Sequence, residues 1–328
     1  MTQGEEKKLP AREIWSILDR TGFAISRLRE LELLKYGLTI EQSSVLYILT
    51  NTREGSITPG ELENITMRQH HSISVLTSGM AASGLVKKVK HLDGKRLKIE
   101  LTPKGREHYL QTTITSLEES FSALSEKEWL ILSTFFTGLL LKSRRMLNLA
   151  TDLSTKIADE NTNLRQGLHI HELWTLLDRT RFAISRLRSL ELAHFGLTIE
   201  QSSILHMISN RETTTVKDME DLTMRRQHSI SSLLKGTIKM GIVTRVRENK
   251  EKRFRIELTQ YGKHLYQSLT VNSLEEIFSV LSPLEKEKMT ELLKRLLGRA
   301  RYLLGMAYQP PFFQPDAGGI NAPGNKTQ

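Results

Sequence analysis

The first part of the chain places apolar residues three or four positions apart, which is the spacing of one face of a helix. Between residues 15 and 34 this pattern includes Ile17, Leu18 and Ile25, and it stops before Gly37. We therefore predict a long first helix that Gly37 terminates.

Three shorter helices are predicted to follow. Thr39 is suited to cap the second, because Gln42 stands three residues further on and completes a capping box. Thr58 and Pro59 begin the third helix, and the fourth covers residues 69–82. Two short helices separated by a turn, here the third and the fourth, are typical of a helix-turn-helix.

The period then changes to that of a strand. Leu97, Ile99 and Leu101 alternate with charged residues, and the dipeptide Asp93-Gly94 is a strong signal for a hairpin. A basic two-stranded ribbon directly after a helix-turn-helix is a wing. We therefore predict a winged helix-turn-helix fold, mainly α with a small β-wing.

Two helices are predicted to close the domain. Pro103 opens the first, which we expect to run to about residue 124, and Ser125 with Glu128 forms a capping box for the second. The second helix, at residues 126–150, is more apolar than one small domain can bury by itself. We expect it to form an association surface.

The whole pattern occurs twice. The segment WSILDRTGFAISRLRELELLKYGLTIEQSSVL begins at Trp15, and it matches WTLLDRTRFAISRLRSLELAHFGLTIEQSSIL, which begins at Trp174, at an offset of 174 − 15 = 159. From Ile65 and Leu222 onward the offset is 222 − 65 = 157, so the second copy is two residues shorter in the intervening loop. We predict a duplicated domain, because a solenoid would need more copies of a shorter unit.

The repeat divides the chain into four expected segments. Copy one occupies residues 1–150, a linker 151–168, copy two 169–308 and a tail 309–328. The linker is polar and lacks a helical stripe. The tail is rich in Pro, Gly, Asn and Gln, and we interpret it as disordered.

The composition favours a polyanionic partner. The formal net charge is +10 over 328 residues, which suits nucleic acid or an anionic membrane surface. The absence of cysteine removes disulfides, Cys-zinc sites and thiol redox sensing, and it fits a cytoplasmic protein. The polar start shows no secretory signal, and the most apolar run, residues 130–141, is too short to span a bilayer.

The order of these elements resembles the MarR family of bacterial transcription regulators. The resemblance is carried by LTIEQSSVL, MRQHHSISVLTSGMAASGLV and DGKRLKIELTPKG in copy one, and by LTIEQSSIL, MRRQHSISSLLKGTIKMGIV and KRFRIELTQYG in copy two. The family implies an obligate dimer in which the first and last helices of two subunits interlock. Two recognition helices then enter successive major grooves.

This chain departs from the family by carrying both copies in one polypeptide. We expect the two winged helix-turn-helix domains to pair within the chain as a pseudo-dimer, through their long N- and C-terminal helices. A tether makes such pairing independent of dilution. Pairing between chains, which would give a higher oligomer of four domains, stays open as the alternative.

Under this resemblance the two recognition helices supply the contacts to DNA. Arginine suits guanine O6 and N7 and glutamine suits adenine N6 and N7, whereas serine and histidine also bind phosphates. For each residue base contact, phosphate contact and no contact stay open. The candidates are Arg68, Gln69, His70, His71, Ser72 and Ser74 in copy one, and Arg225, Arg226, Gln227, His228, Ser229 and Ser231 in copy two.

The basic wing residues are candidates for phosphate or minor-groove contacts, because they follow the recognition helix in both copies. A solvated strand face is the alternative interpretation of such a charge run. The candidates are Lys95, Arg96, Lys98, Lys252, Arg253 and Arg255.

Two further patterns need an interpretation. The motif at residues 19–29 and 178–188, DRTxFAISRLR, repeats almost unchanged, and we favour the dimer seam or intrahelical ion pairs over an effector pocket. His169 and His171 have no carboxylate or cysteine at ligand spacing. We interpret them as surface or helix-start residues, not as a metal site.

The favoured interpretation is a sequence-specific regulator that binds double-stranded DNA, with repression as the family's usual mode. Members often release DNA when a small, often aromatic, ligand binds between the dimer helices and the winged domain, so a small-molecule effector is a further expected partner. We expect no cofactor and no enzymatic activity, because the sequence has no nucleophile elbow, P-loop, HExxH or dinucleotide fingerprint.

Two other classes of protein compete with this interpretation. A winged helix can instead serve as a protein-interaction module that does not bind DNA specifically. A protein bound to a membrane surface would need a basic amphipathic helix, which the pattern does not show.

Overall fold

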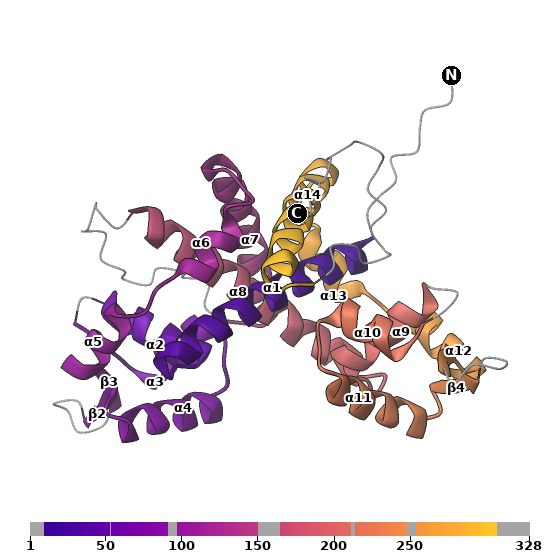
Figure 1. Cartoon of the computed structure of the whole chain (residues 1–328), viewed down its shortest axis with the longest axis horizontal. Coiled ribbons are helices and arrows are strands. Elements are labelled where there is room, and N and C mark those ends of the chain that lie inside the picture. The colour runs from indigo at the N-terminus through magenta and orange to yellow at the C-terminus, as the bar shows by residue number, and fades with distance from the viewer. Residues whose placement is uncertain are drawn as a thin grey trace, which may run out of the picture.

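The structure, a computed structural model, describes residues 10–52, 54–90, 97–149, 165–210, 214–247 and 254–306. Within these ranges the protein is mostly helical and has two small antiparallel sheets. Figure 1 shows two lobes, one from each copy, on either side of a central group of long helices. The predicted fold class, mainly α with small β-wings, is confirmed.

The elements of copy one follow one another in the winged-helix order. They are α1 (Ala11–Leu33), the 3-10 helix η1 (Leu34–Tyr36), α2 (Ile40–Thr50), β1 (Ser56–Ile57), α3 (Pro59–Thr66), α4 (His70–Ala82), β2 (Val86–Lys90), β3 (Leu97–Leu101), α5 (Pro103–Leu110), α6 (Thr115–Phe121) and α7 (Glu126–Met146).

Copy two has corresponding elements. They are α8 (Arg165–Ala193), α9 (Ile199–Ser209), α10 (Val216–Thr223), α11 (Gln227–Lys239), β4 (Val243–Arg247), β5 (Phe254–Leu258), α12 (Gln260–Ser268), α13 (Asn272–Phe278) and α14 (Pro283–Leu303).

Side-chain caps fix where the helices begin. The Thr39 hydroxyl accepts a hydrogen bond from the Gln42 backbone N–H at 3.2 Å, and the Gln42 side chain accepts one from the Thr39 N–H at 2.9 Å. Ser125 and Glu128 form the same reciprocal pair at the start of α7. Both predicted capping boxes are confirmed, and matching boxes start α9 and α14 in copy two.

Each wing is an antiparallel hairpin. β2 pairs with β3 in a register that sets Val86 opposite Leu101, and β4 pairs with β5 in the same way. The predicted turn at Asp93-Gly94 lies outside the described residues. In copy one the short strand β1 adds to β3, which the sequence pattern did not predict.

The single helix predicted from Pro103 to about residue 124 is wrong, because the structure has α5 and α6 with a break between them. Residues 112–114 are all β-branched and lose side-chain freedom in a helix. The break is also held from outside: the Arg29 guanidinium donates to the Thr113 carbonyl, and the Glu32 carboxylate accepts from the Thr113 hydroxyl.

Three large hydrophobic cores, and a small cluster of Met67, Leu140 and Ala183, hold the described part of the chain together. One lies in each lobe, around Ile73 in copy one and Ile230 in copy two. The third is shared, because Phe136 of copy one lies in the same cluster as Leu177 and Leu293 of copy two.

The shared core arises because the first and last helices cross between copies. α7 packs against α8, α1 packs against α14, and α1 also contacts α8. The apolar side of α7, which includes the fully buried Phe136 and Leu139, is covered in this way.

The joint between the copies and the end of the chain are described only in part. The predicted tail at 309–328 and most of the predicted linker at 151–168 lie outside the described residues. α8 begins at Arg165, inside the predicted linker, and α7 ends at Met146, before the expected residue 150. No described helix has both the length and the apolarity needed to cross a membrane.

Candidate functional site

The recognition helices α4 and α11 lie along the same side of the molecule, each with its wing strands close by (Figure 1). Ile73 and Ile230 are fully buried, so the opposite face of each helix points outward. The exposed candidates are Gln69, His70, His71, Ser72 and Ser74 in copy one and Arg226, Gln227 and His228 in copy two, while Ser229 and Ser231 are half-buried.

Arg68 and Arg225 differ from the other candidates because their side chains turn inward. Arg68 Nη2 lies 3.1 Å from Glu41 Oε1, and its guanidinium stands 5.0 Å from the ring centre of Phe182 in the other copy. Arg225 is 3.4 Å from a carboxylate oxygen of Glu200 and lies over Phe23 in the same manner. Each arginine therefore connects a helix-turn-helix to a long helix of the other copy, α8 or α1. We call the contact region of α1, α7, α8 and α14 between the two copies the seam.

The wings expose basic residues on their first strands. Lys88 and Lys90 of β2 and Arg245 and Arg247 of β4 are exposed. The predicted site residues did not include them, although Lys88-Val89-Lys90 and Arg245-Val246-Arg247 alternate in the way that places the basic residues outward.

The predicted wing candidates on the second strands are placed differently. Lys98 Nζ lies 2.9 Å from a Glu54 carboxylate oxygen, and Arg255 Nε donates to Glu257 at the same distance. Both side chains are partly buried. The other predicted wing residues, Lys95, Arg96, Lys252 and Arg253, lie outside the described residues.

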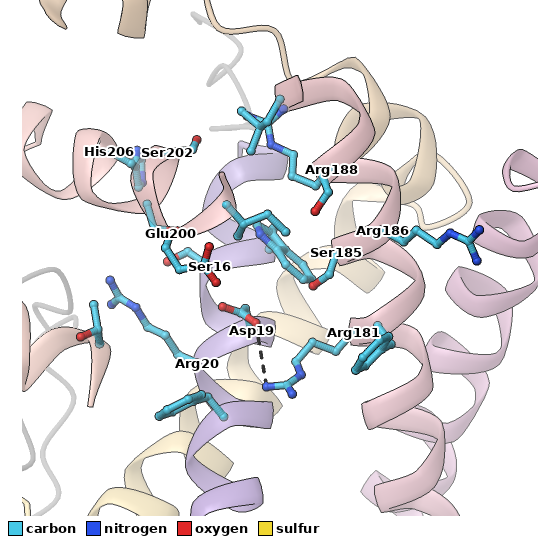
Figure 2. Close-up of a pocket in the computed structure, with 18 of the residues that line it drawn as sticks. Ser16, Asp19, Arg20, Arg181, Ser185, Arg186, Arg188, Glu200, Ser202 and His206 are labelled. Atoms are coloured by element: carbon cyan, nitrogen blue, oxygen red, sulfur yellow. Dashed lines mark ion pairs between the residues drawn. The ribbon is translucent and has the colours of Figure 1, made fainter. Parts of the chain in front are cut away.

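A cavity of about 510 Å³ lies where copy one meets the winged domain of copy two. Trp15, Phe23 and Phe182 supply aromatic walls, and Glu200 and His206 enter from α9. Figure 2 shows Asp19 of α1 and Arg181 of α8 facing each other across it, with Arg186 turned away.

The corresponding place in copy one is almost filled. Its cavity measures about 30 Å³, room for little more than one water molecule. Tyr47 fills it, with its ring centre 3.9 Å from that of His171. At the matching positions of the open cavity stand His206 (47 + 159) and Arg12 (171 − 159).

His171 therefore has a different environment from the predicted one. It is buried at 7% exposure, not at the surface, and burial lowers its pKa to about 3. The imidazole stays neutral and packs as an aromatic ring. The side chain of His169 lies outside the described residues, and the described residues hold no group of three metal-binding side chains.

Part of the winged domain of copy two is similar in sequence to a known family. Residues 195–253 match the MarR family. This part of copy two therefore resembles the MarR family. The matched segment contains α9, α10, α11 and β4, so it includes the exposed Arg226 and Gln227 and the wing residues Arg245 and Arg247.

Several solved structures are similar to part of the chain. The organohalide-sensing RdhR transcriptional regulator in its ligand-free form is 21% identical, with 52% of this chain and 92% of that chain covered and a TM-score of 0.37. Wild-type MarR from E. coli in its apo form is 18% identical over 41% and 97%, with a TM-score of 0.30. Disulfide-formed AbfR is 19% identical over 44% and 99%, with a TM-score of 0.32. No curated protein matches the chain.

The sequence-based predictions missed one pair of arginines that holds each helix-turn-helix in place. Arg144, 2% exposed at the end of α7, donates to the Asn64 carbonyl at 2.8 Å and lies 3.2 Å from the Met67 sulfur. Met67 has a φ of 60° in the turn between α3 and α4, a left-handed conformation that costs a non-glycine residue energy. Arg301 makes the matching contact in copy two, to Asp221. The available signal was an arginine at the same place in the last turn of both closing helices.

Proposed function

We propose that the chain is a sequence-specific regulator of transcription that binds double-stranded DNA. In this proposal it is a bacterial, cytoplasmic repressor and not an enzyme, and its two copies act as one intrachain pseudo-dimer. The supporting observation is that α4 and α11 are exposed on the same side, each beside a basic wing strand. Phosphate contacts would supply affinity and the N-terminal parts of the two helices would supply specificity.

The operator is proposed to have two unlike half-sites. Gln69 of copy one corresponds to Arg226 of copy two, and His70 corresponds to Gln227. Glutamine favours adenine and arginine favours guanine, so the two recognition helices should prefer different bases. A pseudo-palindrome whose half-site centres lie about 10 base pairs apart is the expected target.

Titration of the chain's own upstream DNA with the purified protein tests this proposal. Fluorescence anisotropy should show tight binding that survives an excess of unrelated duplex. Arg226→Ala should weaken specific binding by about tenfold or more, since one good base contact is worth about 1–3 kcal/mol. Lys239→Ala, which removes an equal charge from the exposed far end of the same helix, is the matched control. Equal binding to any duplex, or equal loss in both variants, would contradict the proposal.

We further propose that the open cavity binds a small aromatic anion and thereby regulates DNA binding. Arg12, Arg20 and Arg225 line it together with the aromatic side chains, and their charge exceeds that of the two lining carboxylates, Asp19 and Glu200. The cavity is lined by residues of α4 and of the seam helices, so a bound ligand would change the position of a recognition helix. One ligand per chain is expected, because the corresponding place in copy one is filled.

Calorimetric titration with benzoate as the probe, and with uncharged benzamide as its control, tests the cavity. Benzoate should bind at one site per chain more tightly than benzamide and should change DNA affinity. Copy one has Tyr47 at the position that corresponds to His206. His206→Tyr should therefore fill the open cavity in the same way and abolish benzoate binding. No benzoate binding, two equal sites, or unchanged binding in this variant would refute the cavity proposal without affecting the proposed DNA binding.

A further inference from the structure

The two copies of the motif at residues 19–29 and 178–188 differ at one position. Copy one reads DRTGFAISRLR and copy two reads DRTRFAISRLR, so Gly22 corresponds to Arg181. The residues lie on α1 and α8, which contact each other in the centre of the molecule. A single change inside an otherwise identical motif is therefore located where the two copies meet.

Gly22 and Arg181 also face each other in space. A Cβ atom added to Gly22 would lie 2.7 Å from Arg181 Cδ and 3.2 Å from its Nε, which is too close for either to stay in place. The Arg181 side chain, 17% exposed, thus occupies the space that the missing side chain of Gly22 leaves free.

The guanidinium of Arg181 lies between two carboxylates, one from each copy. Its Nη2 is 3.6 Å from Asp178 Oδ1 one turn earlier on α8, and its Nη1 is 4.0 Å from Asp19 Oδ1 on α1. Figure 2 shows the contact with Asp19. Arg181 therefore lies close to both Asp19 and Asp178, which occupy the same position of the motif in the two copies.

One pair of hydrogen bonds across the seam is the same in both directions. The Thr21 hydroxyl donates to the Leu293 carbonyl at 3.2 Å, and the corresponding Thr180 hydroxyl donates to the Phe136 carbonyl at 3.1 Å. Two first copies or two second copies could form these bonds equally well. Such contacts hold the seam together but do not select which copies pair.

We infer that Arg181, seated in the space left by Gly22, is the residue that makes unlike copies pair. Two second copies would bring two arginines into this space, where they would clash and repel each other. Two first copies would leave the space empty and would set two Asp19 carboxylates at the seam without the arginine that lies between them. The pair of copy one with copy two is the one arrangement in which volume and charge both match.

A second glycine-to-arginine difference disfavours the pairing of two first copies. Arg295 of α14 corresponds to Gly138 of α7 (138 + 157). Arg295 reaches across the seam, where its Nη1 lies 2.5 Å from Glu128 Oε1 and its Nη2 donates to the Ala123 carbonyl at 2.6 Å. Two first copies would have no such bridge, so Arg295 disfavours that pairing, while Arg181 disfavours pairing of two second copies.

A swap of the two residues in the full-length chain tests the inference. Gly22→Arg should lower the melting temperature by roughly 5 °C or more, because it overpacks the seam. Gly22→Arg combined with Arg181→Gly should recover most of that loss, since the seam again holds one glycine and one arginine and the new arginine again has an aspartate three residues before it. A double variant no more stable than Gly22→Arg, or one that does not fold, would overturn the inference.

Mixing two full-length variants separates pairing specificity from a merely structural role. The Gly22→Arg chain carries arginine in both copies, and the Arg181→Gly chain carries glycine in both. Sedimentation of the equimolar mixture, after joint refolding, should show a complex of about 75 kDa (2 × 37.5 kDa) that neither variant forms alone. A mixture that contains only the species seen with the separate variants would contradict the inference. Neither experiment includes DNA, so the result does not depend on the proposed function.

Discussion

At the scale of single residues, arginines perform several distinct tasks in this chain. Arg226 is exposed at the start of a recognition helix, Arg68 is ion-paired beneath one, and Arg144 is buried against the turn that precedes it. Sequence alone predicts that such residues are abundant and where they lie along the helices. It does not predict which of them turn inward, because that depends on Glu41, Phe182 and other partners that only the fold brings near.

Arg144 should matter for both stability and DNA binding. Arg144→Met leaves the partly buried Asn64 carbonyl without its donor and should lower the free energy of unfolding by about 1–3 kcal/mol. It also releases the strained Met67 turn, so DNA affinity should fall as well. Arg145→Met, at the exposed neighbouring position, should change neither property. Chemical denaturation and anisotropy on both variants measure the difference, and equal behaviour of the two would refute this role.

Glu128 should make the seam sensitive to acid. The Arg295 guanidinium and the Ser125 cap hold its pKa at about 2, below about 4.3 for an unfolded glutamate. A depressed carboxyl pKa adds stability above pH 4.3, and this stability is lost as the pH falls toward 2. The melting temperature of the protein should therefore drop more between pH 5 and pH 2 than that of Arg295→Ala. Parallel pH profiles for the two proteins would exclude the bridge as a source of acid sensitivity.

At the scale of elements, the sequence predicted most of the helix-turn-helix and the strands of the wing. The capping boxes at Thr39 and Ser125 and the alternation along β3 depend only on residues that are close in sequence. The sequence alone is therefore enough to predict them. The break between α5 and α6 was missed because Arg29 and Glu32, about 80 residues away in sequence, hold it open. The burial of His171 was missed for the same kind of reason, because its partner, Tyr47, belongs to the other copy.

The first strands of the wings should contribute more to DNA affinity than the second strands do at their described positions. Lys88→Ala and Arg245→Ala should each reduce the slope of log K against log salt by about one, because each removes one exposed phosphate contact. Lys98→Ala should leave the slope nearly unchanged, since Glu54 already pairs with that amine. Binding isotherms over a salt series give the slopes, and the reverse order would place the DNA on the other strand.

At the scale of the whole molecule, the tether and the seam act together. The tether keeps copy one and copy two at a high effective concentration, and the crossed helices bury a shared core between them. The repeat predicted two similar domains, but not that one cavity would be open and its counterpart filled. That difference arises from Tyr47 and His171 on one side and from His206 and Arg12 on the other.

The most direct test of the account is the mass of the complex between protein and operator. Sedimentation equilibrium at low micromolar concentration, on a duplex that contains both half-sites, counts the chains bound to each DNA molecule. We expect one chain of 37.5 kDa per duplex, with both half-sites protected in a parallel footprint. Two chains per duplex, or one chain that protects a single half-site, would contradict it.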